Sequence, residues 1–160
     1  FREKPKPRNM VKELVMKHQI PFEQIQHIKL GEDYIKEDGT RIKNEELTTS
    51  SPPSYSYAFC SDTRYDESII PCIEGVDLLY HEATFLHEME YQAKKTAHTT
   101  ALQAATIAKK AKVKQLIIGH FSARYKNTAL LLKEAKTVFE NTVLAEEGMK
   151  YSPPTPQRGE

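Results

Sequence analysis

The chain has 160 residues, of which 28% are charged and 39% hydrophobic, and its formal net charge is +1. These values are typical of a soluble globular protein, and a domain of this length buries roughly 70% of its unfolded surface. No stretch approaches the ~20 apolar residues that a membrane helix needs, so we expect no membrane partner.

The positive charges are unevenly distributed. Residues 91–133 contain Lys and Arg but neither Asp nor Glu, and residues 1–17 are also rich in Lys and Arg. Two interpretations stay open: the run forms solvated helix faces, or it forms a basic surface that neutralises phosphates. Cys60 and Cys72 lack CxxC spacing and lie among apolar residues, which predicts buried free thiols and suits a reducing cytoplasm.

The first third of the chain predicts a small appended unit. Residues 10–19 have helical apolar spacing with Asn9 as N-cap, and Pro21 ends that helix. Alternating apolar and polar residues from 25 to 42, interrupted by a Glu-Asp-Gly turn at 37–39, predict a β-hairpin. The composition of residues 48–54, TTSSPPS, predicts a linker.

The rest of the chain predicts an α/β domain, because strands alternate with helices. Alanines spaced along the second predicted helix indicate a packing face, and the Pro-rich residues 151–160 are expected to be loose. The predicted strands are 55–60, 76–80, 115–119 and 142–145, and the predicted helices are 66–73, 99–112 and 128–139.

Polar side chains follow the predicted strands at the points where they end. Asp62 follows the first strand, His81 and Glu82 the second and His120 the third, while His98 precedes a helix. Since ligands of α/β sheets collect beyond the carboxyl ends of the strands, we expect these groups to meet at one edge. Asp62 and His120 are ligands that zinc accepts. A catalytic zinc usually has three protein ligands, so the sequence predicts only part of a metal site.

Four motifs in series resemble the ribonuclease Z family: S-D-T at 61–63, H-E-A-T-F at 81–85, A-H-T-T-x-x-Q-A-A at 97–105 and G-H-F-S-A-R-Y at 119–125. The resemblance covers roughly residues 55–147. Residues 1–47 resemble the flexible arm with which the family binds tRNA, although Pro21-Phe22-Glu23 replaces the usual Gly-Pro pair.

The resemblance implies a metallo-β-lactamase-type αββα sandwich and a zinc-dependent endoribonuclease that removes the 3′ trailer from precursor tRNA, leaving a 3′ hydroxyl. It implies two zinc ions per complete site, with Asp62 and His120 as ligands. Glu82 and His98 match the catalytic acid–histidine pair beside the leaving group. His81 is expected to orient its loop, and Ser122 and Arg124 to contact backbone phosphate, although Arg124 can equally form a structural ion pair.

The family's His-x-His-x-Asp-His motif does not occur in the chain. We therefore expect the carboxyl-terminal half of such an enzyme, inactive alone, whereas the complete protein is expected to be a cytoplasmic homodimer. The expected division is an arm at 1–47, a linker at 48–54, half of the catalytic domain at 55–150 and a tail at 151–160.

Two other functions stay open. One is a hydrolase of the same fold that acts on small phosphodiesters or sulfate esters, which needs neither an arm nor a basic surface. The other is a non-catalytic interaction module that has lost its metals, which predicts replacement of Asp62, Glu82, His98 or His120, and none of these is replaced.

Overall fold

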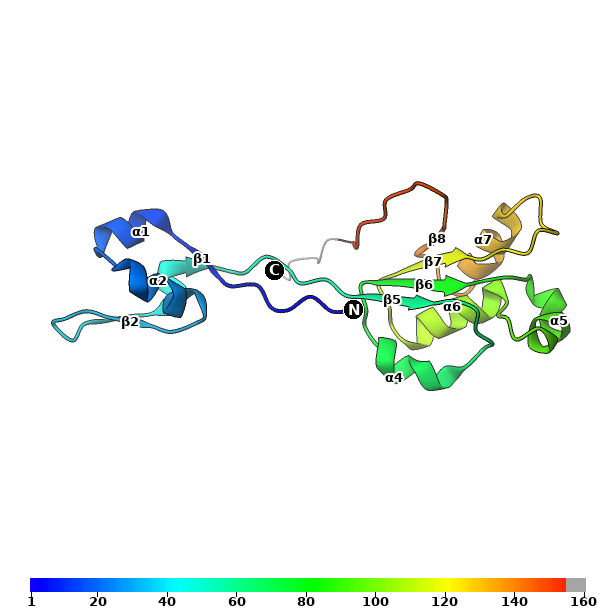
Figure 1. The fold of residues 1–160 in the computed structure, drawn as a ribbon, viewed down its shortest axis with the longest axis horizontal. Coiled ribbons are helices and arrows are strands. Elements are labelled where there is room, and N and C mark those ends of the chain that lie inside the picture. The colour runs from blue at the N-terminus through cyan, green and yellow to red at the C-terminus, as the bar shows by residue number, and fades with distance from the viewer. Residues whose placement is uncertain (155–160) are drawn as a thin grey trace. The chain divides into compact units, whose positions relative to one another are not determined.

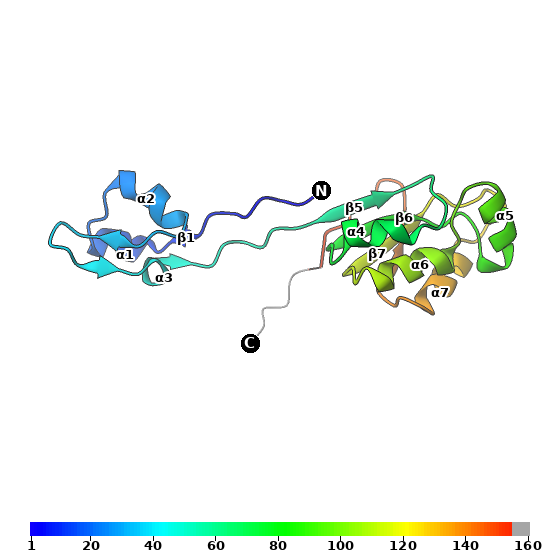
Figure 2. The ribbon, with the colours of Figure 1, turned by 90° about the horizontal axis from the view of Figure 1, so that it is seen from below.

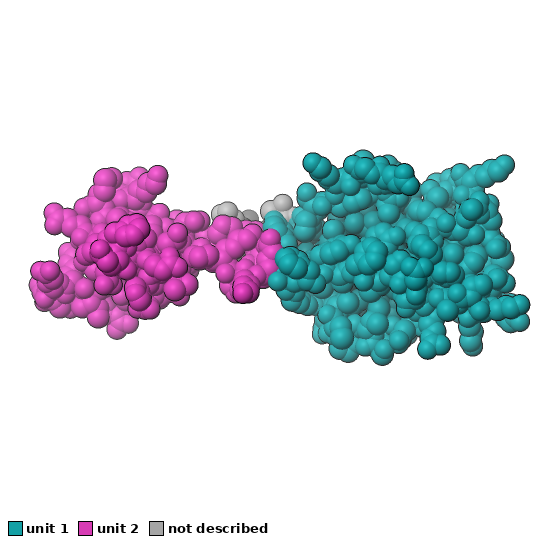
Figure 3. Space-filling model, in the orientation of Figure 1, with its two compact units in different colours: residues 1–2, 55–160 teal, residues 3–54 magenta. Residues whose placement is uncertain are grey.

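The computed structural model describes residues 1–154, so most of the predicted loose tail lies outside the described residues. The chain divides into two compact units, residues 3–54 and residues 1–2 together with residues 55 onward (Figure 3). Thr48 and Thr49, which were expected in a linker, form a short strand of the first of these units.

The unit formed by residues 3–54 is built from two antiparallel strand pairs, β1 with β4 and β2 with β3, and three short helices around a small apolar core. Its elements in chain order are β1 (Asn9–Met10), α1 (Lys12–Lys17), α2 (Phe22–Lys29), β2 (Tyr34–Ile35), β3 (Arg41–Ile42), α3 (Asn44–Leu47) and β4 (Thr48–Thr49).

Two predictions for this unit need correction. Asn9 lies in β1 and does not cap α1, whose N-cap is Val11. The predicted hairpin is confirmed only at β2 and β3, since residues 25–29 belong to helix α2. Ile25 and Ile28 both pack on the core of the unit, and their spacing of three residues places them on one face of a helix.

The second unit contains a parallel four-stranded sheet in the order β5-β6-β7-β8 (Figure 1). Its elements are β5 (Tyr57–Cys60), the 3₁₀ turn Glu67–Ile69, α4 (Ile70–Ile73), β6 (Leu78–Glu82), the 3₁₀ turn His87–Met89, α5 (Glu90–Lys95), α6 (Ala101–Lys110), β7 (Gln115–Gly119), α7 (Ala129–Lys136) and β8 (Thr142–Leu144). The predicted strands and helices are confirmed within a few residues at their ends, whereas α5 was not predicted.

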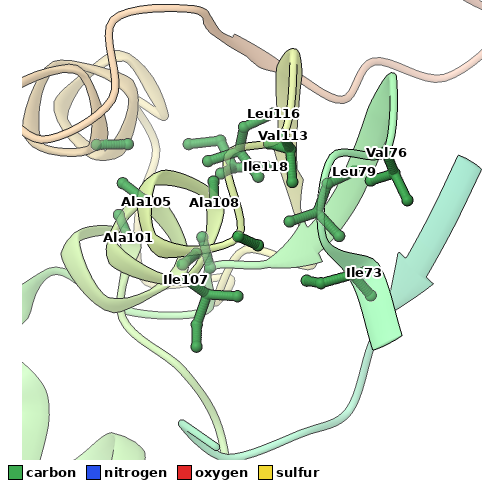
Figure 4. Packing of buried hydrophobic residues seen from close by; sticks show 14 of the residues in the cluster. Ile73, Val76, Leu79, Ala101, Ala105, Ile107, Ala108, Val113, Leu116 and Ile118 are labelled. Carbon is green, nitrogen blue, oxygen red and sulfur yellow. The ribbon is translucent and has the colours of Figure 1, made fainter. Parts of the chain in front are cut away.

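Helices α4, α6 and α7 lie on one face of this sheet (Figure 2). The alanines of α6, among them Ala101, Ala105 and Ala108, face Leu116 and Ile118 of β7 (Figure 4). Small side chains let the helix approach the sheet closely, so the alanine pattern is a packing face, as predicted. A Thr100–Gln103 capping box fixes the start of α6.

The opposite face of the sheet is partly open. Phe59 keeps 63% of its surface exposed, and its ring stacks on that of Tyr80 with a centroid distance of 4.6 Å. Gly119 lies on the same face, where an added Cβ atom would come within 2.5 Å of the Tyr80 hydroxyl.

Both cysteines are free, but Cys72 is exposed on α4, so the prediction of buried thiols is wrong for this residue. Among residues 1–154, no helix is long and apolar enough to cross a membrane.

Candidate metal centre and catalytic pair

The carboxyl ends of three neighbouring parallel strands bring the predicted residues together. Glu82 is the last residue of β6, His120 follows β7 directly, and Asp62 lies two residues beyond β5. His98 reaches the same edge from the turn between α5 and α6. The four residues therefore meet at one edge of the sheet, as predicted.

Asp62 and His120 both adopt left-handed backbone conformations, with φ of 49° and 58°. Such conformations cost roughly 1–3 kcal/mol for residues other than glycine and concentrate at functional sites, where the surrounding structure enforces them. Both predicted metal ligands are thus among the five residues other than glycine with positive φ in residues 1–154, and each lies in a turn just past a strand.

The Glu82 carboxylate is fully buried and ties three loops together. Oε1 accepts hydrogen bonds from the backbone N–H of Thr63 at 2.7 Å and from Nδ1 of His98 at 3.0 Å. Oε2 accepts from the Thr84 hydroxyl at 2.6 Å and from the backbone N–H of Thr99 at 3.1 Å.

Burial alone would raise the pKa of the Glu82 carboxyl, but hydrogen bonds from the Thr84 hydroxyl, the His98 ring and two backbone amides outweigh it and lower the pKa. Glu82 is therefore ionised at neutral pH and fixes the orientation of the His98 ring.

His120 is held through Thr84. Nδ1 of His120 lies 3.1 Å from the Thr84 hydroxyl, which also lies 2.9 Å from the His120 carbonyl oxygen. Because the hydroxyl donates to Glu82 at 2.6 Å, it accepts from Nδ1–H of His120. The Nε2 atom of His120 lies 3.3 Å from the Asp62 carboxylate.

Asp62, His98 and His120 each offer one donor atom, and these atoms lie within 4.8 Å of one another. One carboxylate and two imidazoles fit a divalent metal such as zinc. The histidines are also braced as metal ligands usually are, His98 by a carboxylate and His120 by a hydroxyl. The sequence predicted Asp62 and His120 as ligands, and the structure adds His98 to the same donor cluster.

The side chain of His81 faces the protein interior rather than this cluster. Its ring is fully buried, and Nδ1–H donates to the Glu82 carbonyl oxygen at 2.8 Å, in keeping with the expected role in orienting the loop. Nε2 has no hydrogen-bond partner among the described residues. Burial lowers the pKa of His81, so the ring is neutral at pH 7.

Ser122 and Arg124 lie beside the site and contact each other. Nε of Arg124 donates to the Ser122 hydroxyl at 3.1 Å, and the guanidinium lies 5.0 Å from the centroid of the Phe85 ring. The Phe85 ring in turn packs edge-on against His98. The described residues offer Arg124 no acidic partner, so the alternative of a structural ion pair is not supported there.

Part of the acid-free run is paired with acidic side chains from outside it. Lys110, Lys112 and Lys114 pair with Glu67, Glu74 and Asp77, which come from earlier in the chain. These three lysines are therefore structural, and the interpretation of the run as one phosphate-binding surface is too broad.

Sequence reasoning missed the threonines that organise the site. The Thr99 hydroxyl donates to the Thr63 carbonyl at 2.6 Å, and Thr84 links Glu82 to His120. Thr63, Thr84 and Thr99 all lie inside the motifs quoted above, and this position was the only sign of their importance. A threonine hydroxyl can donate to or accept from many groups, so its residue type alone does not predict these contacts.

No protein-family model matches the chain. Among curated proteins, "Ribonuclease Z" of Parabacteroides distasonis is 50% identical over 152 residues, which are 95% of this chain and 50% of that protein. "Ribonuclease Z" of Bacteroides thetaiotaomicron is 48% identical over 93% of this chain and 47% of its own length. The chain thus spans about half the length of the curated relatives it matches.

Two solved structures are also similar. A metallo-β-lactamase-fold protein from Bacillus subtilis, YhfI, has a TM-score of 0.55 and 32% identity, covering 59% of this chain and 39% of that one. A long-form RNase Z from yeast has a TM-score of 0.51 and 28% identity, covering 57% of this chain and 12% of that one. The chain is homologous to ribonuclease Z proteins along nearly its whole length, and the predicted α/β fold of metallo-β-lactamase type is confirmed.

Proposed function

We propose that this chain is the carboxyl-terminal half of a zinc-dependent endoribonuclease that removes the 3′ trailer from precursor tRNA and leaves a 3′ hydroxyl. The observation that most supports the proposal is the Glu82–His98 pair, joined at 3.0 Å beside the donor cluster, in a chain 50% identical to a ribonuclease Z. Residues 1–49 would be the tRNA-binding arm, 50–54 the linker, 55–150 half of the catalytic domain and 151–160 the tail.

Asp62 and His120 are the proposed zinc ligands of this chain, and the complete site would hold two ions. Bound zinc would supply Lewis-acid stabilisation of the scissile phosphate and an acidified water. The chain lacks the His-x-His-x-Asp-His motif, so we expect no activity from the chain alone.

His98 is the proposed proton donor to the departing 3′ oxygen, and Glu82 is the group that orients it. Nδ1 of the ring is occupied by the ionised carboxylate, so the proton leaves from the other ring nitrogen. A positioned acid of this kind contributes typically 10²–10⁴-fold to the rate.

His98 has a second possible role. Its place in the donor cluster and its carboxylate partner are also the features of a third metal ligand. The two roles differ in one measurable property, because loss of a ligand lowers the metal content and loss of a proton donor does not.

Ser122 and Arg124 are proposed to bind the RNA backbone next to the scissile bond, because the described residues leave the Arg124 guanidinium without an acidic partner. The proposed partners are precursor tRNA and, in the complete protein, a second copy in a homodimer. A cytoplasmic location is likewise proposed and agrees with two free cysteines.

The alternative that best fits the same site is a hydrolase of small phosphodiesters or sulfate esters. Deleting residues 1–47 from the complete protein separates the two functions. Our proposal expects loss of precursor tRNA cleavage with retained hydrolysis of a small chromogenic diester. Unchanged cleavage of both substrates would contradict the tRNA-binding role of the arm, and a complete protein that cleaves only the small diester would favour the alternative.

A further inference from the structure

A pocket of about 280 Å³ opens beside the candidate metal centre. Its lining combines two cations, one acid, one aromatic ring, one amide and one imidazole, contributed by Arg64, Lys94, Glu90, Tyr65, Gln103 and His98. Pockets for small organic ligands begin at roughly 300 Å³, so this pocket lies at the small end of that range.

His98 connects this pocket to the metal centre. The residue lines the pocket, and its donor atom also lies within 4.8 Å of those of Asp62 and His120. The hydrogen bond to Glu82 fixes the ring between the two sites. A ligand in the pocket therefore has the proposed proton donor at its boundary.

The single acid of the pocket is already engaged. Nε2 of Gln103 donates to Glu90 at 3.0 Å, and His87 lies 3.8 Å from the other carboxylate oxygen. Oε1 of Gln103 accepts from the backbone N–H of Thr100 at 3.1 Å, so the amide cannot turn without breaking the cap of α6. These contacts hold the side chains of this wall in place.

The two cations, in contrast, are available to a ligand. Within residues 1–154, neither the Arg64 guanidinium nor the Lys94 ammonium forms a hydrogen bond or ion pair, and both side chains are exposed. The backbone N–H of Thr63 donates to Glu82 at 2.7 Å. This bond fixes the backbone next to Arg64. Two cations and an aromatic ring lining the same pocket are suited to a phosphate attached to a planar base.

We infer that this pocket binds the ribonucleotide on the 5′ side of the scissile bond, with Arg64 and Lys94 on the phosphate that joins it to the preceding nucleotide. The inference rests on the proposed function. In that reaction His98 protonates the departing 3′ oxygen, so the nucleotide that carries this oxygen must lie next to His98. His98 lines this pocket, so the pocket can hold that nucleotide.

The test is cleavage of precursor tRNA by the complete protein, with a neutral methylphosphonate in place of that one phosphate. We expect the modification to lower kcat/KM of the unaltered protein by roughly 10-fold, the loss of one charge-assisted contact. On the normal substrate, Arg64→Gln and Lys94→Gln should each lower kcat/KM by a similar factor. On the modified substrate, the kcat/KM of each variant should be only slightly lower than that of the unaltered protein, because the contact is already lost. Lys133→Gln, an exposed cation that does not line the pocket, should behave like the unaltered protein.

Two outcomes would overturn the inference while the proposed function stands. One is efficient cleavage of the modified substrate by the unaltered protein. The other is that the losses in kcat/KM from the substitution and from the methylphosphonate multiply in full in Arg64→Gln and Lys94→Gln. If the complete protein cleaves no precursor tRNA, the proposed function fails and the assignment to its substrate fails with it. Adenosine 5′-monophosphate, titrated into the complete protein and followed by NMR, then decides separately whether the pocket takes a nucleotide. Binding should weaken in Arg64→Gln and not in Lys133→Gln, and absence of binding would rule the pocket out.

Discussion

Nδ1 of His98 donates a 3.0 Å hydrogen bond to Oε1 of Glu82, and the Glu82 carboxylate is entirely shielded from solvent. A buried charge is tolerated only when it is paired and hydrogen-bonded, and Glu82 has four donors. The Glu82 carboxylate therefore stabilises three loops and also fixes the orientation of His98, the proposed proton donor.

Replacing Glu82 by Gln should affect both properties. The new amide N–H₂ would face existing donors and leave at least one buried donor unsatisfied, at a cost of roughly 1–3 kcal/mol. In the complete protein, precursor tRNA cleavage should fall by about 10²-fold or more as His98 loses its carboxylate. Urea unfolding and single-turnover kinetics measure the two effects. Glu88→Gln, on an exposed side chain, is the matched control and should change neither.

Replacing His98 by Ala should separate proton donation from metal binding. Cleavage of precursor tRNA should fall by about 10²–10⁴-fold with unchanged metal content, and the defect should shrink on a diester with a nitrophenolate leaving group. That leaving group departs without protonation, so it does not need the donor.

Asp62→Ala and His120→Ala are the comparison for His98→Ala, since both should lose metal and fail on both substrates. Metal analysis of the three variants, together with their kinetics on precursor tRNA and on the nitrophenyl diester, distinguishes a proton donor from a metal ligand. Metal loss in His98→Ala, or an equal defect on both substrates, would reassign His98 as a ligand or a structural residue.

His81 predicts a pH dependence of stability. Burial lowers the pKa of its ring in the folded protein below the usual 6.5. As the pH falls below 6.5, the unfolded chain therefore binds a proton that the folded chain does not, and the free energy of unfolding decreases until the pH reaches the folded pKa.

Between pH 7.5 and 5.5, the contribution of His81 to this decrease should be on the order of 1 kcal/mol. His81→Gln loses the titrating group and should show a correspondingly smaller decrease when urea unfolding is measured at the two pH values. The same decrease in both proteins would mean that the His81 ring is protonated equally well in the folded state.

Gly119 is needed because of Tyr80. A Cβ atom at position 119 would meet the Tyr80 hydroxyl at 2.5 Å and two ring carbons at 2.9 Å, so Gly119→Ala should destabilise the protein by about 1–3 kcal/mol. Removing the ring should remove the clash, so Gly119→Ala should cost less in a Tyr80→Leu background. Thermal unfolding of the four proteins of this cycle tests the contact, and equal costs in both backgrounds would show that Tyr80 is not the obstacle.

The parts of the structure that local patterns determine were predictable from the sequence. Three of the core strands are short apolar runs with polar residues at or just after their ends, which located Asp62, Glu82 and His120 at one sheet edge. Residues 25–29 were assigned wrongly because Ile25 and Ile28 fit either a strand or a helix until their packing on the core of residues 3–54 is known.

The finer organisation of the site depends on contacts between distant residues. Thr84 joins Glu82 to His120 across a separation of 36 residues, which no local pattern indicates. The pocket beside His98 requires α5, a short helix that begins with a 3₁₀ turn and has too few residues for clear periodicity.

In the proposed function, the complete protein cleaves precursor tRNA at the 3′ trailer with the help of this half of the site. The most direct measurement is incubation of the metal-loaded complete protein with precursor tRNA, followed by analysis of both new RNA ends, with Asp62→Ala in parallel. We predict a single cut that leaves a 3′ hydroxyl on the tRNA and a 5′ phosphate on the trailer, and no cut by Asp62→Ala. Cleavage elsewhere in the RNA, the opposite end groups, or full activity of Asp62→Ala would contradict the proposed function.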